Sequence, residues 1–437
     1  MIRGPCSFPV SEDDIAHAGH LYAMNAVEKR VHDAIDYDGM YRFLEEIVYI
    51  PSFGGDESKA QWYMAKTLEE HGFAVDRWEI DFEELSKHPD FSMSYERGEG
   101  VGVVGVKGEG DRSLMLCGHI DTVAPGDISN WDTIPLVATR KDGRIYGRGT
   151  NDMKGGIAAA LFAAKAVTDI VKLNGRLLFA SCIGEEDGSP GALATALRYS
   201  ADAGIIMEPS ETKLAPKVAG AMSFKITVSG RSVHACVKDE GISAIEKFIL
   251  IHGGLKELES ERNSRLKDPD YSRYASPYAI SIGIIQGGQW AGTVPEKVVF
   301  EGRIGVAVGE DELVARKDLE DKINNIADSD PWLRENRPTV AWDGYSFASS
   351  VVPNDHPIVE SIAGALRDVT GEEPVYEGMT YASDARHLIN VGKTPTTVFG
   401  PGDIRVAHGP NEYVPVKDME VTVKTLALAI MRYLGYE

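Results

Sequence analysis

A buried strand that ends in a cluster of polar residues constrains this chain of 437 residues more than any other feature. Residues 113–117 are small or apolar, as in a strand covered on both faces, and Gly118, His119 and Asp121 follow directly. Open α/β sheets carry their chemistry at the carboxyl ends of strands. The stretch therefore predicts an α/β fold with functional side chains at this edge of the sheet.

A second polar cluster centres on Asp152, in the segment GRGTNDMKGGI. The Ala-rich residues 157–167 come next and predict a helix that packs closely on a sheet. GRGTND has a superficial likeness to a phosphate-binding loop. It lacks the third glycine of a dinucleotide fingerprint, and Asp152 would repel a pyrophosphate, so we do not expect a nucleotide here.

Acidic residues and histidines also follow three further strand-like segments. They are Glu185 and Glu186 after RLLFASCI, Glu208 after AGIIM, and His408 after residues 398–402. Taken singly, such residues are more typical of a capped strand end or a solvated turn than of metal ligands. Together with His119 and Asp152 they form a hard and borderline ligand set, which is suited to Zn²⁺, Co²⁺ or Mn²⁺ in paired sites.

Five motifs along the chain point to one enzyme family. They are GHIDTVAPGD, GRGTNDMKGG, GEEDGSPGA, IMEPS and AHGPNEYVP, in this order. From Asp38 to the C-terminus the chain resembles the M20 metallopeptidase family, which includes acetylornithine deacetylase, succinyl-diaminopimelate desuccinylase, aminoacylase and glutamate carboxypeptidase.

The resemblance implies two divalent metal ions, with Zn²⁺ as the expected ion and Co²⁺ or Mn²⁺ as alternatives. The implied ligands are His119 and Glu208 for one ion, Glu186 and His408 for the other, and Asp152 for both. The resemblance further implies that Glu185 is the general base and that Asp121 orients His119.

The pattern of the sequence changes after Glu208. The segments that follow are a strand at 217–229, a helix at 242–262, strands at 278–286 and 298–308, a helix at 310–326 and a strand at 338–342. This βαββαβ order is the ferredoxin-like pattern. We therefore expect a catalytic α/β domain, with a mostly parallel sheet flanked by helices, in residues 1–214 and 350–437. An α+β lid and dimerisation domain is expected as an insertion in residues 215–349.

The resemblance also assigns residues that would contact the substrate. His234 resembles a family histidine that, in dimeric members, reaches into the partner's active site and stabilises the oxyanion. Arg303 resembles an arginine that binds the carboxylate or acyl end of the substrate. Without the resemblance, a strand-end histidine and a surface arginine explain these two residues equally well. Three residues of GMTYASDARHL resemble a substrate-binding loop: Thr380, Ser383 and Arg386. Asp384 is expected to hold that loop.

These assignments predict a metal-dependent amidohydrolase. Its substrate would be an N-acyl amino acid or a related small N-acylated amine, cleaved to a carboxylate and a free amine. A dipeptidase or a carboxypeptidase would use the same centre. Gly292 stands where family members often carry a substrate-contacting Asn, which leaves another small amide or aryl amine open as the substrate. A binding module without activity would require the loss of a ligand or the base, and the motifs retain all of them.

Composition limits the partners. The formal charge of −22 argues against nucleic acid and anionic membranes, because both would repel the chain. No apolar run reaches the roughly 18–20 residues of a membrane helix.

The cysteines at 6, 117, 182 and 236 lack CxxC spacing, which favours reduced thiols in a cytoplasmic protein. A homodimer through the inserted domain is expected from the resemblance. Apolar spacing at 21–35 predicts an amphipathic helix, and GEGVGVVGVKGEG predicts a Gly-rich hairpin.

Overall fold

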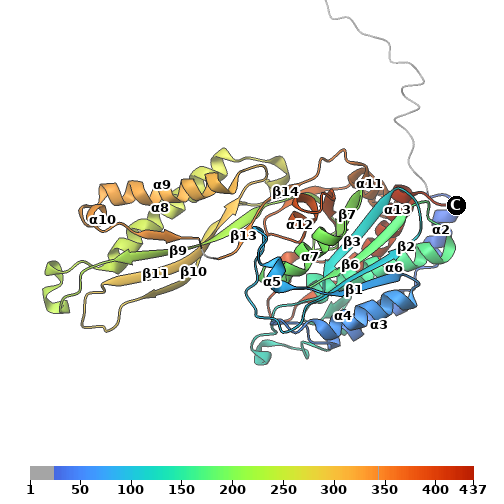
Figure 1. Ribbon diagram of the computed structural model, residues 1–437, viewed down its shortest axis with the longest axis horizontal. Coiled ribbons are helices and arrows are strands. Elements are labelled where there is room, and N and C mark those ends of the chain that lie inside the picture. The colour runs from blue at the N-terminus through green and yellow to red at the C-terminus, as the bar shows by residue number, and fades with distance from the viewer. Residues whose placement is uncertain (1–23, 343) are drawn as a thin grey trace, which may run out of the picture.

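The computed structural model describes residues 24–342 and 344–437, which form a larger and a smaller lobe (Figure 1). The helices of the larger lobe are α2 (Ala26–Asp33), α3 (Tyr37–Tyr49), α4 (Ser58–Glu70), α5 (Phe82–Leu85), α6 (Gly155–Ile170), α7 (Pro190–Arg198), α11 (Pro357–Thr370), α12 (Ala385–Asn390) and α13 (Val416–Leu434). Its strands are β1 (Ala74–Glu79), β2 (Val101–Lys107), β3 (Ser113–His119), β4 (Thr139–Lys141), β5 (Arg144–Tyr146), β6 (Arg176–Cys182), β7 (Ala203–Ile206), β8 (Leu214–Val218), β14 (Ser350–Val351), β15 (Tyr376–Met379), β16 (Thr396–Val398) and β17 (Tyr413–Pro415).

The smaller lobe is built from the middle of the chain. Its strands are β9 (Gly220–Ser229), β10 (Ile280–Gly287), β11 (Lys297–Val306), β12 (Thr339–Ala341) and β13 (Ser346–Phe347), and its helices are α8 (Ala244–Arg265), α9 (Glu312–Ser329) and α10 (Pro331–Glu335).

A nine-stranded sheet organises the larger lobe. The strand order is β1-β2-β6-β3-β7-β16-β8-β14, and β15 also pairs with β8. The four central strands β6, β3, β7 and β16 run parallel, whereas β1 and β2 form an antiparallel edge. Strands β17, β5 and β4 form a separate small sheet. The predicted α/β class with a mainly parallel sheet is confirmed.

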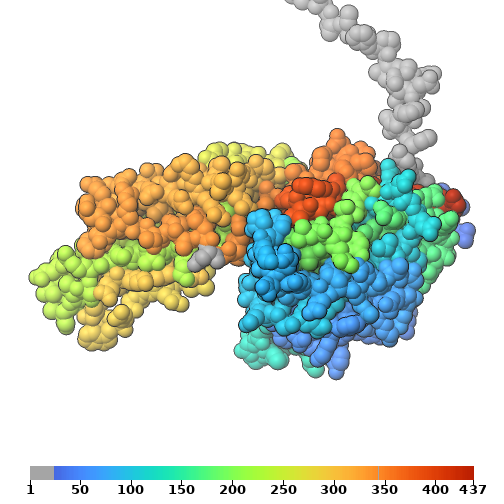
Figure 2. All heavy atoms as spheres, viewed as in Figure 1, coloured from blue at the N-terminus to red at the C-terminus, as the bar shows by residue number. Residues whose placement is uncertain are grey.

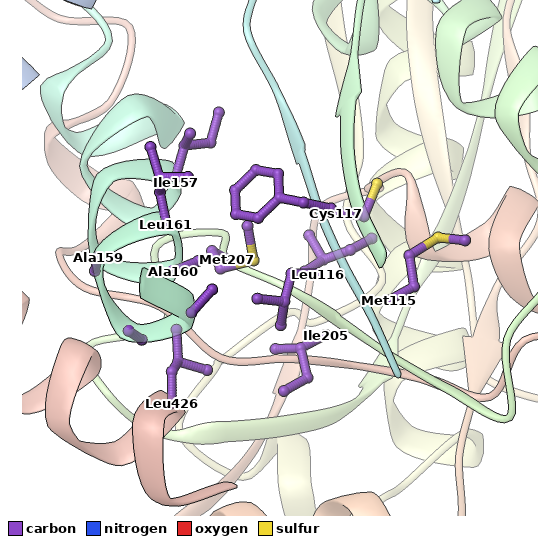
Figure 3. Close-up of a cluster of buried hydrophobic side chains, with 14 of the residues drawn as sticks. Met115, Leu116, Cys117, Ile157, Ala159, Ala160, Leu161, Ile205, Met207 and Leu426 are labelled. Atoms are coloured by element: carbon purple, nitrogen blue, oxygen red, sulfur yellow. The ribbon is translucent and has the colours of Figure 1, made fainter. Parts of the chain in front are cut away.

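Strand β3 is buried because helices cover both faces of the large sheet. Gly118 faces α6, where an added Cβ would lie 2.8 Å from Cγ1 of Ile157, so only glycine permits this close approach. Cys182 of the adjacent β6 faces α7 on the other side, with its Sγ 3.7 Å from Oγ1 of Thr195. Figure 3 shows the apolar cluster between β3, β7, α6 and α13, which includes Leu116, Ile205, Leu161 and Leu426.

The smaller lobe is an antiparallel sheet with α8 and α9 on one face (Figure 1). The strand order is β10-β11-β9-β12, so the second, third, first and fourth strands of the lobe lie side by side. This is the order of the predicted ferredoxin-like pattern. Alternate residues of β9, such as Phe224 and Ile226, are buried and form a separate core with Phe300 and Leu319.

The predicted domain limits stay a prediction, but the strand pairing shows where the chain changes sheets. All of strand β8 except Leu214 falls within the predicted insertion at 215–349, yet the strand pairs with β14, β15 and β16 in the large sheet. The chain enters the smaller sheet at Gly220, and it pairs with the large sheet again at Ser350. Figure 2 shows the smaller lobe projecting from one side of the larger lobe.

The first described helix, α2, lies within the predicted helix at 21–35, of which residues 21–23 fall outside the described part. Asn25 caps α2, and Glu28 completes the capping box. Cys6 also lies outside the described residues. Within residues 24–342 and 344–437, no helix combines the length and the apolar character that crossing a membrane requires.

Candidate metal centre

Three parallel strands of the large sheet end side by side and bring acidic and imidazole side chains to one edge. His119 is the last residue of β3, Glu185 and Glu186 form a short turn after β6, and Glu208 follows β7. Because β6, β3 and β7 are neighbours and run parallel, their carboxyl ends meet. The strand ends that the sequence predicts to carry the chemistry therefore lie side by side at one edge of the sheet.

One triad forms around His119. Its Nε2 lies 3.0 Å from Oδ1 of Asp152 and 3.5 Å from Oε1 of Glu208, and all three side chains are buried. Its Nδ1 donates to the backbone carbonyl of Asp121 at 3.0 Å. Because a carbonyl oxygen only accepts, Nδ1 carries a hydrogen, which leaves Nε2 as the nitrogen that a metal ion would bind. Burial lowers the pKa of His119, but the Glu208 and Asp152 carboxylates outweigh it and raise this pKa well above its usual value, so Nε2 is also protonated here and donates to Asp152. One imidazole and two carboxylates thus converge on one point.

A second triad forms around His408 and shares Asp152. The Nε2 of His408 lies 3.0 Å from Glu186 and 3.4 Å from Oδ2 of Asp152. Within each triad, one ligand atom from every residue lies within 4.8 Å of the others. Asp152 directs Oδ1 to the first triad and Oδ2 to the second, which is the arrangement of a carboxylate that bridges two ions.

The charges around these triads fit bound cations. Burial and the nearby Asp152 carboxylate raise the pKa of both Glu186 and Glu208, so without a positive charge the centre resists full ionisation. The Asp152 and Glu186 carboxylates raise the pKa of His408 to about 10. Imidazole and carboxylate donors in two triads match the ligand preferences of Zn²⁺, Co²⁺ and Mn²⁺.

Glu185 and Asp121 lie beside the triads. Glu185 lines the same cavity and belongs to neither triad. Burial raises its pKa well above the usual range, and the carboxylates of Asp384 and Glu186 act in the same direction. The Asp121 carboxylate accepts a hydrogen bond from the backbone N–H of Glu186 at 3.1 Å. Asp121 therefore contacts His119 through its carbonyl and the Glu186 turn through its side chain.

A buried ion pair that sequence reasoning missed connects the two loops of the centre. The Glu412 carboxylate accepts from the backbone N–H of Asp152 at 3.2 Å and pairs with Arg148 at 2.5 Å. Arg148 also donates to the carbonyl of His408 at 3.1 Å. Arg148 lies in the motif GRGTND and Glu412 in HGPNE, so the motifs could have drawn attention to both residues. The sequence near either residue does not show that the two side chains would meet in the folded chain.

The predicted substrate residues do not all reach the cavity. Arg303 of β11 lines it and donates to the carbonyl of Thr380 at 3.4 Å. Ser383 is buried, and its Oγ accepts from the backbone N–H of Ala385. Arg386 donates to the carbonyls of Ser346 and Gly188. Arg303 is thus the one predicted substrate-binding cation among the residues that line this cavity.

His234 lies far from the centre of its own chain. Ala221 of β9 lines the cavity, whereas His234 follows the opposite end of that strand at Ser229. Eight residues of extended chain separate Ala221 from Ser229 by about 26 Å, at the usual rise of a strand. His234 is exposed there, and its Nδ1 accepts from the backbone N–H of Cys236. Gly292 lies next to His234, since the Gly292 carbonyl accepts a hydrogen bond from the backbone N–H of Ala235.

The cavity at the centre has a volume of about 180 Å³, and both lobes line it. The larger lobe contributes Asp152, Glu185, Glu186, Glu208, Tyr381, Ala382, Ile404 and His408, and the segment from Ala221 to Phe347 contributes Ala221, Arg303, Tyr345 and Phe347. Fold and site together define an α/β protein with a candidate two-metal centre between two lobes.

Comparison with known proteins agrees with this class. Residues 115–432 match the model of peptidase family M20/M25/M40. The chain is 29% identical over 381 residues to an N-formyl-4-amino-5-aminomethyl-2-methylpyrimidine deformylase of Bacillus subtilis, which covers 82% of this chain and 85% of that protein. It is 31% identical over 341 residues to acetylornithine deacetylase of Myxococcus xanthus, with 77% and 84% covered. The fold also matches human carnosine dipeptidase 1, with a TM-score of 0.71 and 18% identity over 94% of this chain and 99% of that chain.

The chain belongs to peptidase family M20/M25/M40. This confirms the family predicted from the five motifs. The protein is accordingly an enzyme that hydrolyses amide bonds.

Proposed function

We propose that the protein is a dinuclear metal deacylase that cleaves a small N-acylated amine to a carboxylate and a free amine. The observation that carries the proposal is the shared Asp152, which directs one carboxylate oxygen to each triad. The curated relatives support a deacylase, because their names include a deformylase, an acetylornithine deacetylase and a probable desuccinylase.

The proposed ligands follow the two triads. His119 and Glu208 would hold one ion, Glu186 and His408 the other, and Asp152 would bridge them. We propose Zn²⁺ as the native ion, with Co²⁺ and Mn²⁺ as alternatives, because two imidazoles and three carboxylates suit these borderline cations. Bound there, such ions lower the pKa of a shared water and polarise the scissile carbonyl.

Glu185 would move the proton. It lines the cavity outside both triads, so its carboxylate can accept the proton of the attacking water and later give it to the leaving amine. Asp121 would hold His119 in the required tautomer through its carbonyl oxygen. Arg303, on the opposite lobe, would bind the acyl or carboxylate end of the substrate, while Thr380, Ser383 and Arg386 would shape the loop beside it.

The proposed assembly is a homodimer in which His234 serves the partner's site. Four isoleucines of the smaller lobe are 42–59% exposed: Ile245 and Ile249 on α8, and Ile284 and Ile285 on the edge strand β10. A helix face and a sheet edge of this kind suit a twofold interface. Since His234 follows the end of β9 that lies about 26 Å from Ala221 at the cavity, a partner is the geometrically simpler recipient. It would donate to the oxyanion there.

A cytoplasmic location is also proposed. The described cysteines Cys117, Cys182 and Cys236 are free thiols, and the first two are buried in core strands. Proteins of oxidising compartments more often use cysteines in disulfides.

A substrate panel tests the proposed function. The metal-loaded protein is incubated with N-formyl, N-acetyl and N-succinyl amines and with dipeptides, and amine release is measured. The proposal expects turnover of the N-acylated amines with kcat/KM at least about tenfold above that of dipeptides. Faster cleavage of the dipeptides would instead assign a peptidase, which uses the same centre.

A further inference from the structure

A buried ion-pair network that the proposed mechanism does not use lies beside the turn that carries Glu185. The Arg97 guanidinium lies between two carboxylates, with Nη2 2.8 Å from Oε1 of Glu57 and 2.9 Å from Oδ1 of Asp187. All three side chains are only 1–2% exposed. Asp187 is the last residue of the short turn Glu185–Asp187. The network, which we call the Arg97 clamp, therefore reaches the segment that carries the proposed base.

The guanidinium of Arg97 engages each carboxylate with a pair of donors. Nε and Nη2 donate to the two oxygens of Glu57 at 3.2 and 2.8 Å, and Nη1 and Nη2 donate to the two oxygens of Asp187 at 2.9 Å each. These bonds fix the plane of the guanidinium relative to both acids. A lysine ammonium has the same charge but lacks the planar fork, so it cannot hold two carboxylates in this geometry.

Asp187 connects the turn to the chain that precedes β2. Its Oδ2 accepts from the backbone N–H groups of Ser94 at 3.2 Å and Tyr95 at 2.7 Å. Gly184 precedes the turn with a φ of 73°, and a Cβ there would lie 2.8 Å from Nη2 of Arg97. Arg97 thus packs directly against the backbone where the turn begins, and its partner Asp187 lies where the turn ends.

The Glu57 end of the clamp is also fixed to the large sheet. Glu57 directly precedes α4, and Gln61 in the first turn of that helix donates to the carbonyl of Ser181 on β6 at 2.8 Å. On the other side of Glu57 in sequence, Oγ of Ser52 donates to the carbonyl of Ile120 after β3 at 2.8 Å. The clamp is therefore anchored to the same two strands whose ends carry the metal centre.

The position of Glu185 depends on the backbone of the turn. Within residues 24–342 and 344–437, no hydrogen bond reaches the Glu185 carboxylate. Glu186 differs, because its carboxylate lies 3.0 Å from Nε2 of His408 and its backbone N–H donates to Asp121. A shift of the turn would therefore move the Glu185 carboxylate, whereas Glu186 has contacts of its own that retain it.

We propose that Arg97 is a positioning residue that holds Glu185 within proton-transfer distance of the attacking water. This inference rests on the proposed role of Glu185 as the base and adds a residue to that reaction. Arg97 does not line the cavity, so it acts through Asp187 and the backbone of the turn. Proton transfer requires a distance of about 2.6–3.2 Å, and a misplacement of about 1 Å can cost about 10²-fold in rate.

A conservative substitution separates the geometry of the clamp from its charge. Arg97→Lys keeps the buried positive charge, so the variant is expected to fold and to bind two metal equivalents. Because the fork is lost, kcat is expected to fall about 10- to 100-fold while KM stays within about twofold. Asp187→Asn is a second route to the same loss, since it keeps an oxygen for the N–H of Tyr95 but gives up one acceptor for Arg97.

The smaller lobe offers a matched control. Arg262 of α8 is likewise 1% exposed and pairs with two carboxylates, Glu310 and Asp318, but none of these three residues lines the cavity. Arg262→Lys is expected to keep kcat within about twofold. A similar loss of kcat in Arg262→Lys and Arg97→Lys would show a general effect of disturbing a buried arginine and would overturn the inference.

A double-mutant cycle shows whether Arg97 acts through Glu185. Glu185→Gln already lacks the base, so adding Arg97→Lys is expected to change its residual kcat by less than about twofold. A merely structural role would lower the residual kcat by the same factor as in the wild-type background. Such additivity, wild-type kcat in both Arg97→Lys and Asp187→Asn, or loss of metal in proportion to activity would each contradict the positioning role.

The clamp can be tested with any amide that the protein cleaves. All variants are assayed with N-formyl and N-acetyl amines and with dipeptides. Turnover of dipeptides alone would reject the deacylase proposal, yet the cycle would still decide the role of Arg97. Wild-type kcat in Glu185→Gln would reject the assignment of the base and this inference with it.

Hydrogen exchange supplies a readout that does not depend on activity. In the metal-loaded protein, the backbone amides of residues 184–189 are expected to exchange at least about tenfold faster in Arg97→Lys than in wild type, and at the wild-type rate in Arg262→Lys. Mass spectrometry of the corresponding peptide measures both. Unchanged exchange in Arg97→Lys would show that the turn keeps its position without the clamp, which would overturn the inference even if no amide of the panel were cleaved.

Discussion

At the scale of single residues, Glu185 and Glu186 are adjacent in sequence but have different surroundings. Glu186 contacts His408 and belongs to a triad, whereas Glu185 lines the cavity outside both triads. Glu185→Gln is therefore expected to lower kcat by at least about 10²-fold, because the base is lost, while both metal equivalents stay bound. Kinetics and metal analysis on the same sample check this. Metal loss in proportion to activity would show that Glu185 is a ligand.

Asp152 is predicted to be the residue on which both metal sites depend. Asp152→Ala removes a ligand from each triad, so the variant is expected to lose both ions on dialysis. His408→Ala removes a ligand from one triad and is expected to weaken mainly one ion. Equilibrium dialysis with metal analysis distinguishes the two variants. An Asp152→Ala protein that retains two tightly bound equivalents would contradict the bridging assignment.

At the scale of elements, the loops after β5 and before β17 are joined by the buried pair of Arg148 and Glu412. Glu412→Ala would leave Arg148 buried beside the loops without its counter-charge, which is expected to lower the free energy of unfolding by about 3–5 kcal/mol. Glu412→Gln keeps an acceptor for the N–H of Asp152, so this variant is expected to fold. Because it loses the charge that pairs with Arg148 and holds the two loops, it is expected to bind metal about 10- to 100-fold more weakly.

An exposed pair supplies the control for Glu412. Glu373 pairs with Arg367 on the surface, and exposed pairs contribute about 0–1 kcal/mol. Glu373→Ala is expected to change neither metal affinity nor stability beyond that. Chemical denaturation and metal titration measure both effects. A Glu412→Gln protein with wild-type metal affinity would show that the pair does not position the centre.

The elements show which parts of the fold the sequence could predict. Periodicity is a local signal, and it placed the helix at 242–262 and the strand at 298–308 within a few residues of α8 (Ala244–Arg265) and β11 (Lys297–Val306). The segment GEGVGVVGVKGEG misled, because β2 (Val101–Lys107) is a single strand that pairs with β1 and β6 and not with itself. Its alternating glycines instead allow close contact, as where Trp78 covers Gly102.

The site divides in the same way. The predicted ligands could be found because each lies at the end of a strand or in the loop that follows one, and such positions show in the sequence. The pair of Arg148 and Glu412 could not be found, because it depends on two loops that meet only in the folded chain. Arg386 lies against the ring of Phe347, and His234 follows the far end of β9. Both positions depend on tertiary structure, so the local sequence could not predict them either. The roles of all these residues stay predictions.

At the scale of the whole molecule, the proposed dimer makes each active site depend on both chains. Glu185→Gln and His234→Ala are each expected to be inactive alone. After subunit exchange, half of the dimers are mixed and each mixed dimer has one complete site of two, so activity is expected to rise toward about one quarter of wild type. Size-exclusion chromatography with light scattering checks the dimer, and native mass spectrometry with one variant isotopically labelled checks the exchange. Absence of recovery despite exchange would place the action of His234 within its own chain.

The central claim is that two metal ions, held between the lobes by a shared Asp152, make this chain an amide hydrolase. The most direct measurement is a titration of the metal-free protein with Co²⁺, in which bound metal and release of amine from an N-formyl or N-acetyl amine are followed together. The account predicts no turnover without metal, two equivalents bound per chain, and activity that reaches its maximum as the second site fills. Full activity in the metal-free protein, or saturation of binding and activity at a single equivalent, would contradict it.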